Sequence, residues 1–368
     1  MAGIYIHIPF CKQRCSYCDF FSSTESSRKE KYVNKLCDEL FERKEYLKEP
    51  VETIYFGGGT PTLLSSADFE KIFHTLRLIF GEDNNREVTL EANPDDITSV
   101  YLNSIRHLPF NRISLGVQSF YDQELQLLNR RHNAQSAIRA VQLLQQAGYG
   151  NISIDLIYGL PDQNQEIWFT TLQRAIDLQI QHISAYHLTY EEGTPLYKKL
   201  KEGSLIPVDE EMSNRLFELL IDTLQSAGFE QYEISNFARS GFQSRHNVSY
   251  WNGTHYLGIG ASAHSYNGIS RQWNMKTLSP DDRLPDYEIE IIDKKTAYND
   301  FIITRLRTMN GMDLNELTAL FGEPRKSYCL QQARKYIAND HLCYGNNRLQ
   351  LTQKGIFISD GIMSDLMV

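Results

Sequence analysis

The sequence predicts an α/β fold built around a parallel β-sheet. Short β-rich segments alternate with helical segments over the first 190 residues, and several β-rich segments are continuous apolar runs, as expected of strands buried on both faces. Six strand–helix units in series indicate a parallel sheet. They are fewer than the eight units of a closed barrel, so the pattern leaves open a partial barrel or an open doubly wound sheet.

The expected strands lie at residues 3–8, 53–56, 88–92, 112–116, 152–157 and 182–188. The expected helices between them, where apolar residues recur at helical spacing, lie at residues 31–46, 65–80, 136–147 and 165–178. Ser65 is a suitable N-cap for the second helix, and Gly148 ends the third. In either fold, ligands gather at the carboxyl ends of parallel strands, so the residues that follow each strand form the candidate site.

The strand–helix alternation stops near residue 189. A helix is expected at 209–227, and the segment 241–268, rich in Gly, His and aromatic residues, is expected to form functional loops. Residues 296–368 predict helices followed by a short hairpin at Asn346-Asn347, similar to a winged-helix module. We expect a strand–helix domain at 1–205, a connecting segment at 206–293 and a small, mainly helical, winged-helix-like domain at 294–368.

Length and charge limit the class of protein. The 368 residues suggest two domains, and the formal net charge of −9 argues against non-specific binding of nucleic acid. The N-terminal segment has no basic region or cleavage site, and Pro9 interrupts its apolar run, so we expect a strand and not a signal peptide. No apolar run approaches the ~20 residues of a membrane span. We therefore expect a cytoplasmic protein, in which clustered thiols indicate metal or redox chemistry more often than disulfides.

Three of the six cysteines, Cys11, Cys15 and Cys18, follow the first expected strand at C-x3-C-x2-C spacing. A four-iron cluster normally takes four thiolates. Three thiolates would leave one iron open to a small ligand, as an open zinc position does in catalytic sites. A structural zinc site completed by His7 or by a distant ligand is the alternative, but the three remaining cysteines provide no second cysteine pair. The spacing therefore favours a [4Fe-4S] cluster.

Glycines and polar residues follow the next expected strands. The run 57–59 is Gly-Gly-Gly, which lets the backbone approach a ligand closely but lacks the lysine of a phosphate-binding P-loop. Glu91, Gln118 and Asp155 stand at the ends of the third, fourth and fifth strands. Asp155 interrupts an apolar run, where a carboxylate must be paired or hydrogen-bonded. Arg130 lies beyond the fourth strand. It is either a ligand contact or a solvated charge on a helix.

Taken in order, these motifs resemble the radical S-adenosylmethionine (SAM) superfamily and, within it, the oxygen-independent coproporphyrinogen III oxidase family. The resemblance spans nearly the whole chain and rests on the cysteine motif with Tyr17, on Tyr5-x-His7-x-Pro9-Phe10-Cys11, and on residues 57–62, 116–120 and 155–161. It implies a partial (β/α)6 TIM-like barrel and a [4Fe-4S] cluster whose open iron binds SAM through its amino and carboxylate groups. The SAM-contacting positions that it implies are Tyr5, Tyr17, Gly58, Gly59, Thr60, Glu91, Gln118, Arg130 and Asp155.

Three features are similar to the HemW-type haem chaperone branch of that family. Phe20 stands where the oxidase has a fourth cysteine, and Cys11 lies almost at the start of the chain, without the oxidase's N-terminal extension. His246-Asn247-x-x-Tyr250-Trp251 resembles the branch's H-N-x-x-Y-W signature. A histidine can ligate haem iron, and Tyr250 and Trp251 offer flat apolar faces to a porphyrin. The alternative is a packed loop whose histidine bonds the backbone.

His255 and His264, in the glycine-rich stretch that follows, are weaker candidates for a haem contact.

The resemblance implies a haem chaperone that binds haem and transfers it to an acceptor protein. The alternative is a coproporphyrinogen III oxidase, which performs SAM-dependent oxidative decarboxylation in porphyrin biosynthesis. Phe20 and the short N-terminus disfavour that dehydrogenase activity, and whether the chain is an enzyme stays open. A cluster-bearing interaction protein without chemistry is a third interpretation, against which the polar strand-end residues argue.

The expected partners are haem, a haem-accepting protein and, if SAM is cleaved, an electron donor. We expect no nucleic acid and no transmembrane segment, and a peripheral membrane contact stays open. The chain is expected to be a monomer or a homodimer.

Overall fold

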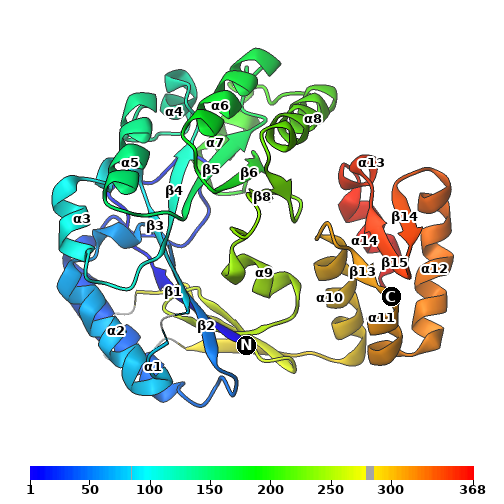
Figure 1. Ribbon diagram of the computed structural model, residues 1–368, viewed down its shortest axis with the longest axis horizontal. Coiled ribbons are helices and arrows are strands. Elements are labelled where there is room, and N and C mark those ends of the chain that lie inside the picture. The colour runs from blue at the N-terminus through cyan, green and yellow to red at the C-terminus, as the bar shows by residue number, and fades with distance from the viewer. Residues whose placement is uncertain (84, 279–285) are drawn as a thin grey trace.

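The computed structural model describes residues 1–83, 85–278 and 286–368. Six parallel strands follow one another in space in the same order as in the chain. They are β1 (Ala2–Ile8), β2 (Val51–Gly58), β3 (Glu87–Ala92), β4 (Arg112–Gln118), β5 (Ile152–Tyr158) and β6 (His182–His187). A doubly wound sheet would reverse its strand order at one point. The unreversed order, curved into an arc in Figure 1, confirms the partial barrel.

Six shorter strands extend the sheet at both ends of the arc. Beyond β6 lie β8 (Asn236–Ala238) and β7 (Glu230–Gln231), and beyond β1 lie β9 (His255–Ile259), β10 (His264–Tyr266), β11 (Ser270–Asn274) and β12 (Tyr287–Ile291). The expectation that 241–268 forms loops was therefore wrong, since this segment holds one helix and two strands. These strands are short and carry glycine and polar residues, so they lack the apolar periodicity that marks a strand in sequence.

Helices cover the convex side of the arc (Figure 1). They are α1 (Lys29–Glu42), α2 (Ser66–Phe80), α3 (Ser99–Ile105), α4 (Asp122–Leu127), α5 (Ala134–Gln146), α6 (Gln165–Asp177) and α8 (Glu210–Ser226). Short 3-10 turns η1 (Ser26–Arg28), η2 (Pro61–Leu63) and η3 (Pro94–Asp96) join some of them to the strands. Ser65 caps α2 in a capping box with Asp68, as the sequence predicts.

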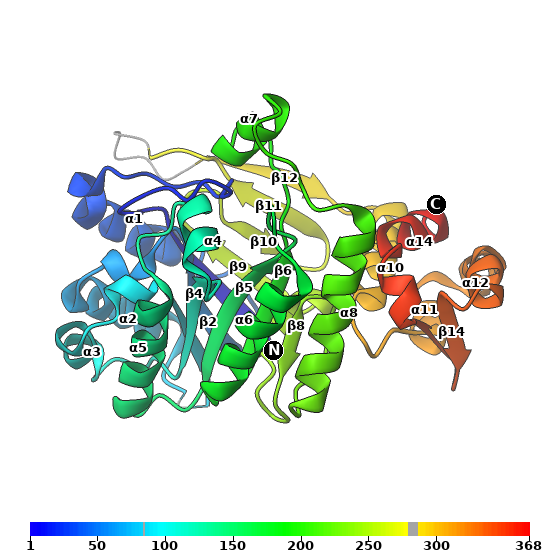
Figure 2. The same ribbon diagram turned by 90° about the horizontal axis from the view of Figure 1, so that it is seen from above.

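The α7 helix (Pro195–Lys201) projects from one end of the barrel, as Figure 2 shows. Its Leu196 N–H donates to the Ser16 carbonyl over 2.9 Å, which ties it to the cysteine loop.

The two faces of the barrel strands differ in polarity. The outward residues, such as Ile6, Phe56 and Leu90, are fully buried under the helices. The inward residues are Tyr5, His7, Thr53, Tyr55, Thr89, Glu91, Arg112, Ser114, Ser153, Asp155, His182 and Ser184. A closed TIM barrel fills its interior with branched apolar side chains. Here the strands alternate in polarity, and only their outer face joins the apolar core, so the barrel interior is built to hold a polar ligand.

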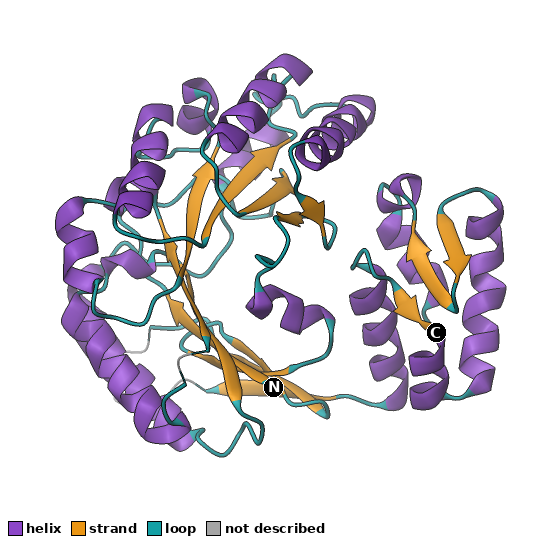
Figure 3. Ribbon diagram, in the orientation of Figure 1, coloured by secondary structure: helices purple, strands orange, loops and turns teal. Residues whose placement is uncertain are grey.

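The last fifth of the chain, from α10 onward, forms a separate group of helices and strands (Figure 3). It has a second apolar core of buried residues such as Tyr298, Ile302 and Leu317. Its helices are α10 (Lys294–Leu306), α11 (Leu314–Phe321), α12 (Glu323–Ala338), α13 (Gln353–Ile356) and α14 (Ser359–Leu366). Its strands β13 (Met312–Asp313), β14 (Leu342–Gly345) and β15 (Arg348–Leu351) form an antiparallel sheet. Asn346 and Asn347 make the expected hairpin turn, with φ of 51° and 56°. The two helices after this hairpin were not expected.

None of the helices in the described parts of the chain is long and apolar enough to cross a membrane.

Candidate cofactor site

Cys11, Cys15 and Cys18 lie in the loop after β1, at the carboxyl end of the barrel. All three are partly buried thiols outside any disulfide. Burial, followed by the charges of Cys15 and Cys11, raises the pKa of Cys18 to about 11, so the three thiols are near enough to interact. Among the described residues no three His, Cys, Asp or Glu side chains are grouped to hold one metal ion. In a four-iron cluster each thiolate binds a different iron.

His7, the fourth ligand considered for zinc, has both ring nitrogens engaged. Nε2 lies 3.0 Å from the Phe21 carbonyl and Nδ1 lies 3.1 Å from the Tyr5 hydroxyl. Burial lowers the pKa of His7. This ring is therefore not free to complete a zinc site with the cysteines.

A chain of hydrogen bonds links two of the cysteines. Thr60 Oγ1 donates to Cys11 Sγ (3.6 Å), and Asn93 Nδ2 donates to Thr60 Oγ1 (3.0 Å). Arg130 Nη2 donates to Asn93 Oδ1 (2.5 Å), and its Nη1 donates to Cys15 Sγ (3.2 Å). The loops after β1, β2, β3 and β4 are thus joined around the cysteines. Arg130 therefore contacts the cysteine loop and is not a solvated charge.

Asn93 was missed as a site residue. The signal for it was its place in Glu91-Ala92-Asn93-Pro94, directly after the third strand.

The glycine run at the end of β2 packs against the cysteine loop. Gly58 has φ of 107°, and a Cβ there would lie 2.4 Å from the His7 ring. A Cβ on Gly59 would lie 2.7 Å from the Phe10 carbonyl. The N–H groups expected to face a ligand are used within the protein, because Gly58 donates to Glu91 Oε2 (3.1 Å) and Gly59 to the Ile8 carbonyl (2.9 Å). These two glycines therefore allow the end of β2 to pack closely against His7 and the backbone of the cysteine loop, where a side chain would not fit.

Two carboxylates lie in the barrel interior, Glu91 on β3 and Asp155 on β5. Glu91 accepts from the Tyr55 hydroxyl over 2.7 Å, and burial raises its pKa to about 7 although Tyr55 and Gly58 oppose this. Asp155 lies 3.4 Å from Ser114 Oγ, and burial raises its pKa to about 6. Both side chains are partly accessible, whereas the residues below them are buried. The interior is therefore open at the carboxyl end of the strands and closed at the other.

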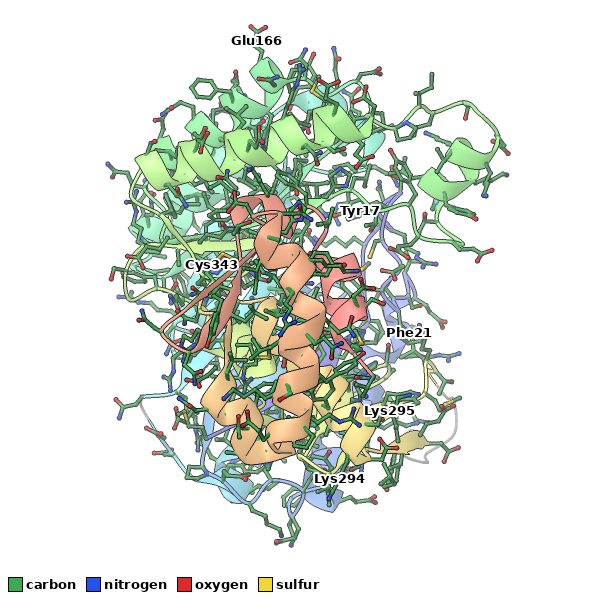
Figure 4. All side chains as sticks on the ribbon, turned by 90° about the vertical axis from the view of Figure 1, so that its right-hand side faces the viewer. Tyr17, Phe21, Glu166, Lys294, Lys295 and Cys343 are labelled. Carbon is green, nitrogen blue, oxygen red and sulfur yellow. The ribbon has the colours of Figure 1, made fainter. Side chains whose placement is uncertain are left out.

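Three further predicted residues surround this opening. Gln118 ends β4 with φ of 68°, in the left-handed region that a glutamine rarely adopts. Tyr5 stacks on Tyr55 with ring centroids 6.0 Å apart. Tyr17 packs against a small apolar cluster that includes Leu196 of α7, and burial raises its pKa. In Figure 4, Tyr17 lies along the N-terminal segment, apart from Cys343 in the last domain.

The α9 helix (Arg245–Trp251) carries the H-N-x-x-Y-W motif and lies on the open side of the arc, facing α10 (Figure 1). His246 is 1% exposed, with Nδ1 2.8 Å from Thr53 Oγ1 and Nε2 2.9 Å from the Tyr250 hydroxyl. Burial lowers the pKa of His246 to about 3, so the ring is neutral. Trp251 is partly exposed at the junction with the last domain, where Arg307 lies 4.9 Å from its ring. The motif thus joins the barrel interior to the last domain.

His255 and His264 lie apart from this interior. His255 Nδ1 pairs with Glu49 over 2.9 Å, and His264 stacks on Trp273 with ring centroids 6.2 Å apart.

A partial barrel with three cysteines after its first strand, above a polar interior, defines a radical SAM protein. Residues 5–175 match the radical SAM superfamily, and residues 292–358 match the HemN C-terminal domain. The protein named heme chaperone HemW of Mycobacterium tuberculosis H37Rv is 31% identical over 99% of this chain and 94% of its own. That of Lactococcus lactis IL1403 is 30% identical over 99% and 97%. The chain therefore belongs to the HemW family.

Two further proteins are similar to this chain along nearly its whole length. The mitochondrial radical S-adenosyl methionine domain-containing protein 1 of Bos taurus is 32% identical over 100% of this chain and 87% of its own. The solved coproporphyrinogen III oxidase HemN of Escherichia coli superposes with a TM-score of 0.85 over 100% of this chain and 90% of that one, at 23% identity. The last comparison shows a shared fold.

As a member of the radical SAM superfamily, the chain uses a [4Fe-4S] cluster and SAM. The residues present fit these groups, because three free thiols stand at the mouth of a lumen lined by acidic and aromatic side chains.

Proposed function

We propose that this chain is a haem chaperone, which binds haem and transfers it to a haem-accepting protein. The observation that carries the proposal is the similarity to proteins named heme chaperone HemW along 99% of the chain. The exposed Phe20, at the position of the oxidase's fourth cysteine, supports it.

We propose that Cys11, Cys15 and Cys18 ligate the cluster, which supplies an open iron for the amino and carboxylate groups of SAM. The proposed SAM contacts are Tyr5, Tyr17, Gly58, Gly59, Thr60, Glu91, Gln118, Arg130 and Asp155. All nine lie in the barrel interior, around its opening or in the loops at the carboxyl ends of the strands. Glu91 and Asp155 would face the positive charges of SAM, and their partial exposure leaves them reachable by a ligand.

For haem we propose the residues of α9: His246 as iron ligand, with Tyr250 and Trp251 against the porphyrin. Because both His246 nitrogens are hydrogen-bonded, ligation requires that the ring leave Thr53 or Tyr250. The Tyr250 hydroxyl is the hydrogen-bond partner of His246 Nε2. Tyr250→Phe should therefore free Nε2 for the haem iron and strengthen haem binding. His246→Ala should weaken haem binding.

The experiment is a haem titration of wild type, His246→Ala and Tyr250→Phe, followed by absorption spectroscopy. His255→Ala is the matched control, since that histidine pairs with Glu49 outside the barrel interior. Equal affinity and the same spectrum for wild type and His246→Ala would contradict the assignment of the ligand. Failure of the wild type to bind haem at all would contradict the chaperone function.

The fold shared with HemN favours one second candidate, an oxygen-independent coproporphyrinogen III oxidase. Cluster-loaded protein would be incubated anaerobically with SAM, a reductant, an electron acceptor and coproporphyrinogen III. Formation of protoporphyrinogen IX would replace the chaperone proposal by the enzymatic one.

We propose a cytoplasmic protein, because three clustered free thiols need a reducing compartment. It would act as a monomer or homodimer with a haem acceptor and, if SAM is cleaved, an electron donor. We propose the domain limits 1–205, 206–293 and 294–368.

A further inference from the structure

Arg112 is a buried arginine for which the cofactor site described above has no role. It is the first residue of β4, and its side chain is 1% exposed. Its Nε and Nη1 atoms are buried without a hydrogen-bond partner among the described residues. A buried guanidinium normally has a carboxylate partner, because removing a charge from water is costly. The lack of such a partner on Arg112 needs an explanation.

Strand register places Arg112 inside the barrel, below the cofactor site. Side chains alternate along a strand, so Arg112, Ser114 and Gly116 face the same way. Ser114 lies one step above Arg112 and contacts Asp155, and Gly116 accepts from Arg130 at the top of the barrel. Thr89 pairs with Arg112 across β3 and β4, and its hydroxyl is also buried and unpartnered. Arg112 is thus on the barrel floor, beneath Glu91 and Asp155.

The groups around this floor are neutral. His182 bonds Ser153 Oγ through Nδ1 (2.7 Å) and the Tyr232 hydroxyl through Nε2 (2.8 Å). Burial and the charge of Arg112 lower the pKa of His182, as they do for His246 of α9. Burial raises the pKa of Tyr232. None of these groups can neutralise a guanidinium.

The one carboxylate low on β3, Glu87, is used elsewhere. It accepts hydrogen bonds from the backbone N–H groups of Arg245 and His246 at the start of α9, each at 3.0 Å. Within the described parts of the chain no ion pair joins Glu87 to Arg112. The charge of Arg112 therefore acts on the acids above it.

We propose that Arg112 is a positioning residue of the SAM site: its guanidinium, which has no ion-pair partner among the described residues, supplies positive charge that favours the ionised forms of Glu91 and Asp155 inside the barrel. The inference rests on the proposed function, in which those two acids bind SAM. SAM carries a positive sulfonium and an ammonium group, so the acids bind it in their ionised form. In a water-poor interior, a charge acts over a longer distance than it does in water. Arg112 accordingly lowers the pKa of both acids, against the larger effect of burial.

Other charged and titratable groups act on the two acids from neighbouring strands, from α9 and from the loops at the strand ends. They are Tyr5, Tyr17, Tyr55, Tyr186, Tyr250 and Arg130. The pKa of each of these tyrosines is raised by burial, so they are neutral at the pH where the acids titrate. Arg130 is tied to Cys15 and Asn93. Arg112 is the cation among the described residues that has no such partner.

The test measures SAM binding to the full chain with its reconstituted cluster, anaerobically, by calorimetry from about pH 5.5 to about pH 8.5. The variants are Arg112→Gln, which loses the charge, and Arg112→Lys, which keeps it. Arg86→Gln is the matched control, since Arg86 donates to the backbone carbonyls of Val51, Phe80 and Gly81 on the outside of the site. We expect the midpoint of the pH dependence to rise by about one unit in Arg112→Gln and to stay unchanged in Arg112→Lys and Arg86→Gln.

If Arg112→Gln does not fold, a second variant still tests the proposal. Thr89→Asp places a carboxylate opposite the guanidinium and neutralises it without removing it, so the midpoint should again rise. Equal midpoints in wild type, Arg112→Gln and Thr89→Asp, or equal shifts in the Gln and Lys variants, would overturn the proposal. Wild type that carries its cluster but binds no SAM would instead contradict the proposed cofactor site and this inference with it.

Discussion

Arg130 donates from Nη1 to the Cys15 sulfur over 3.2 Å, and its Nη2 holds Asn93 and the Gly116 carbonyl at 2.5 Å and 2.6 Å. Burial disfavours the charged guanidinium, but Tyr17 and Cys15 outweigh it, and the pKa of Arg130 is raised. One cation therefore contacts a cysteine sulfur and orders the loops of three strands.

Replacing Arg130 by Gln should weaken both the cluster and SAM binding. A hydrogen bond to a charged group contributes ~1.5–3 kcal/mol, so we expect SAM affinity to fall by about 10- to 100-fold. Cluster content is measured from absorbance and iron analysis, and affinity by calorimetry. Arg131→Gln is the matched control, because its neighbouring guanidinium pairs with Asp95 instead of a cysteine. Equal losses in the two variants would show that the contact with Cys15 has no special role.

The carboxyl of Glu91 should make SAM binding and stability depend on pH in opposite directions. SAM binding rises with pH as Glu91, with a pKa of about 7, loses its proton. Because this pKa is raised on folding, the folded protein holds the proton more tightly than the unfolded chain. Stability of the cofactor-free protein is therefore full below the unfolded pKa of ~4.3 and falls as pH rises towards 7.

Glu91→Gln should remove both effects. Without SAM, this variant should melt at a higher temperature than wild type at pH 8, and its SAM affinity should vary less with pH. Tyr55→Phe should act in the other direction, because loss of the Tyr55 hydroxyl raises the pKa of Glu91 further. Melting temperatures at pH 5 and pH 8 and calorimetric titrations check these outcomes. A wild type whose SAM affinity is flat between pH 6 and pH 8 would contradict the role of Glu91.

The backbone conformation of Gln118 should lower the stability of the fold while supporting SAM binding. Its φ of 68° costs a non-glycine residue ~1 kcal/mol, and strain of this kind is retained at functional sites. Gln118→Gly should therefore raise the melting temperature and weaken SAM binding. Gln179→Gly is the control, since Gln179 has φ of 54° but is exposed after α6. Both variants should gain stability, and only Gln118→Gly should lose SAM affinity.

Much of the barrel could be predicted from the sequence, because its strands and helices carry strong local patterns. The first strand was expected at 3–8 and runs from Ala2 to Ile8, and the helix expected at 65–80 is α2 with Ser65 as its cap. The site residues could be found because a parallel sheet gathers strand ends in one place.

The environment of single residues could not be predicted, since it depends on contacts between distant segments. The sequence leaves His246 either as a haem ligand or as a packed histidine that bonds the backbone. In the structure it is buried and hydrogen-bonded to the side chain of Thr53, 193 positions earlier in the chain. Nothing in the sequence singles out Arg112, yet in the structure it is 1% exposed at the start of β4. The strands β9 to β12 were missed because they are short and carry glycine and polar residues, so they lack the apolar periodicity that marks a strand in sequence.

The ion pair between Glu233 and Arg307 should hold the last domain against the barrel. Arg307 Nε lies 3.3 Å from Glu233 Oε2, and the Glu233 side chain is 1% exposed. Arg307 also covers the Trp251 ring, and the Met309 N–H donates to the Tyr232 carbonyl over 3.1 Å. Removing one partner of a buried pair costs ~3–5 kcal/mol because the other charge stays buried. Arg307→Met should therefore destabilise the protein by about this amount.

The double variant Glu233→Met/Arg307→Met should recover part of this loss, since no buried charge remains. Asp313→Asn is the control, because Asp313 pairs with Arg348 in a more exposed position within the last domain, where solvent weakens such pairs. Urea unfolding gives the stabilities, and limited proteolysis tests whether the last domain is released. If Arg307→Met unfolds like Asp313→Asn and releases no fragment, the pair does not fasten the domains. If Arg307→Met releases the last domain while the barrel stays folded, the ion pair does fasten the two domains. In that case Trp251 of α9 also loses its contact with residue 307.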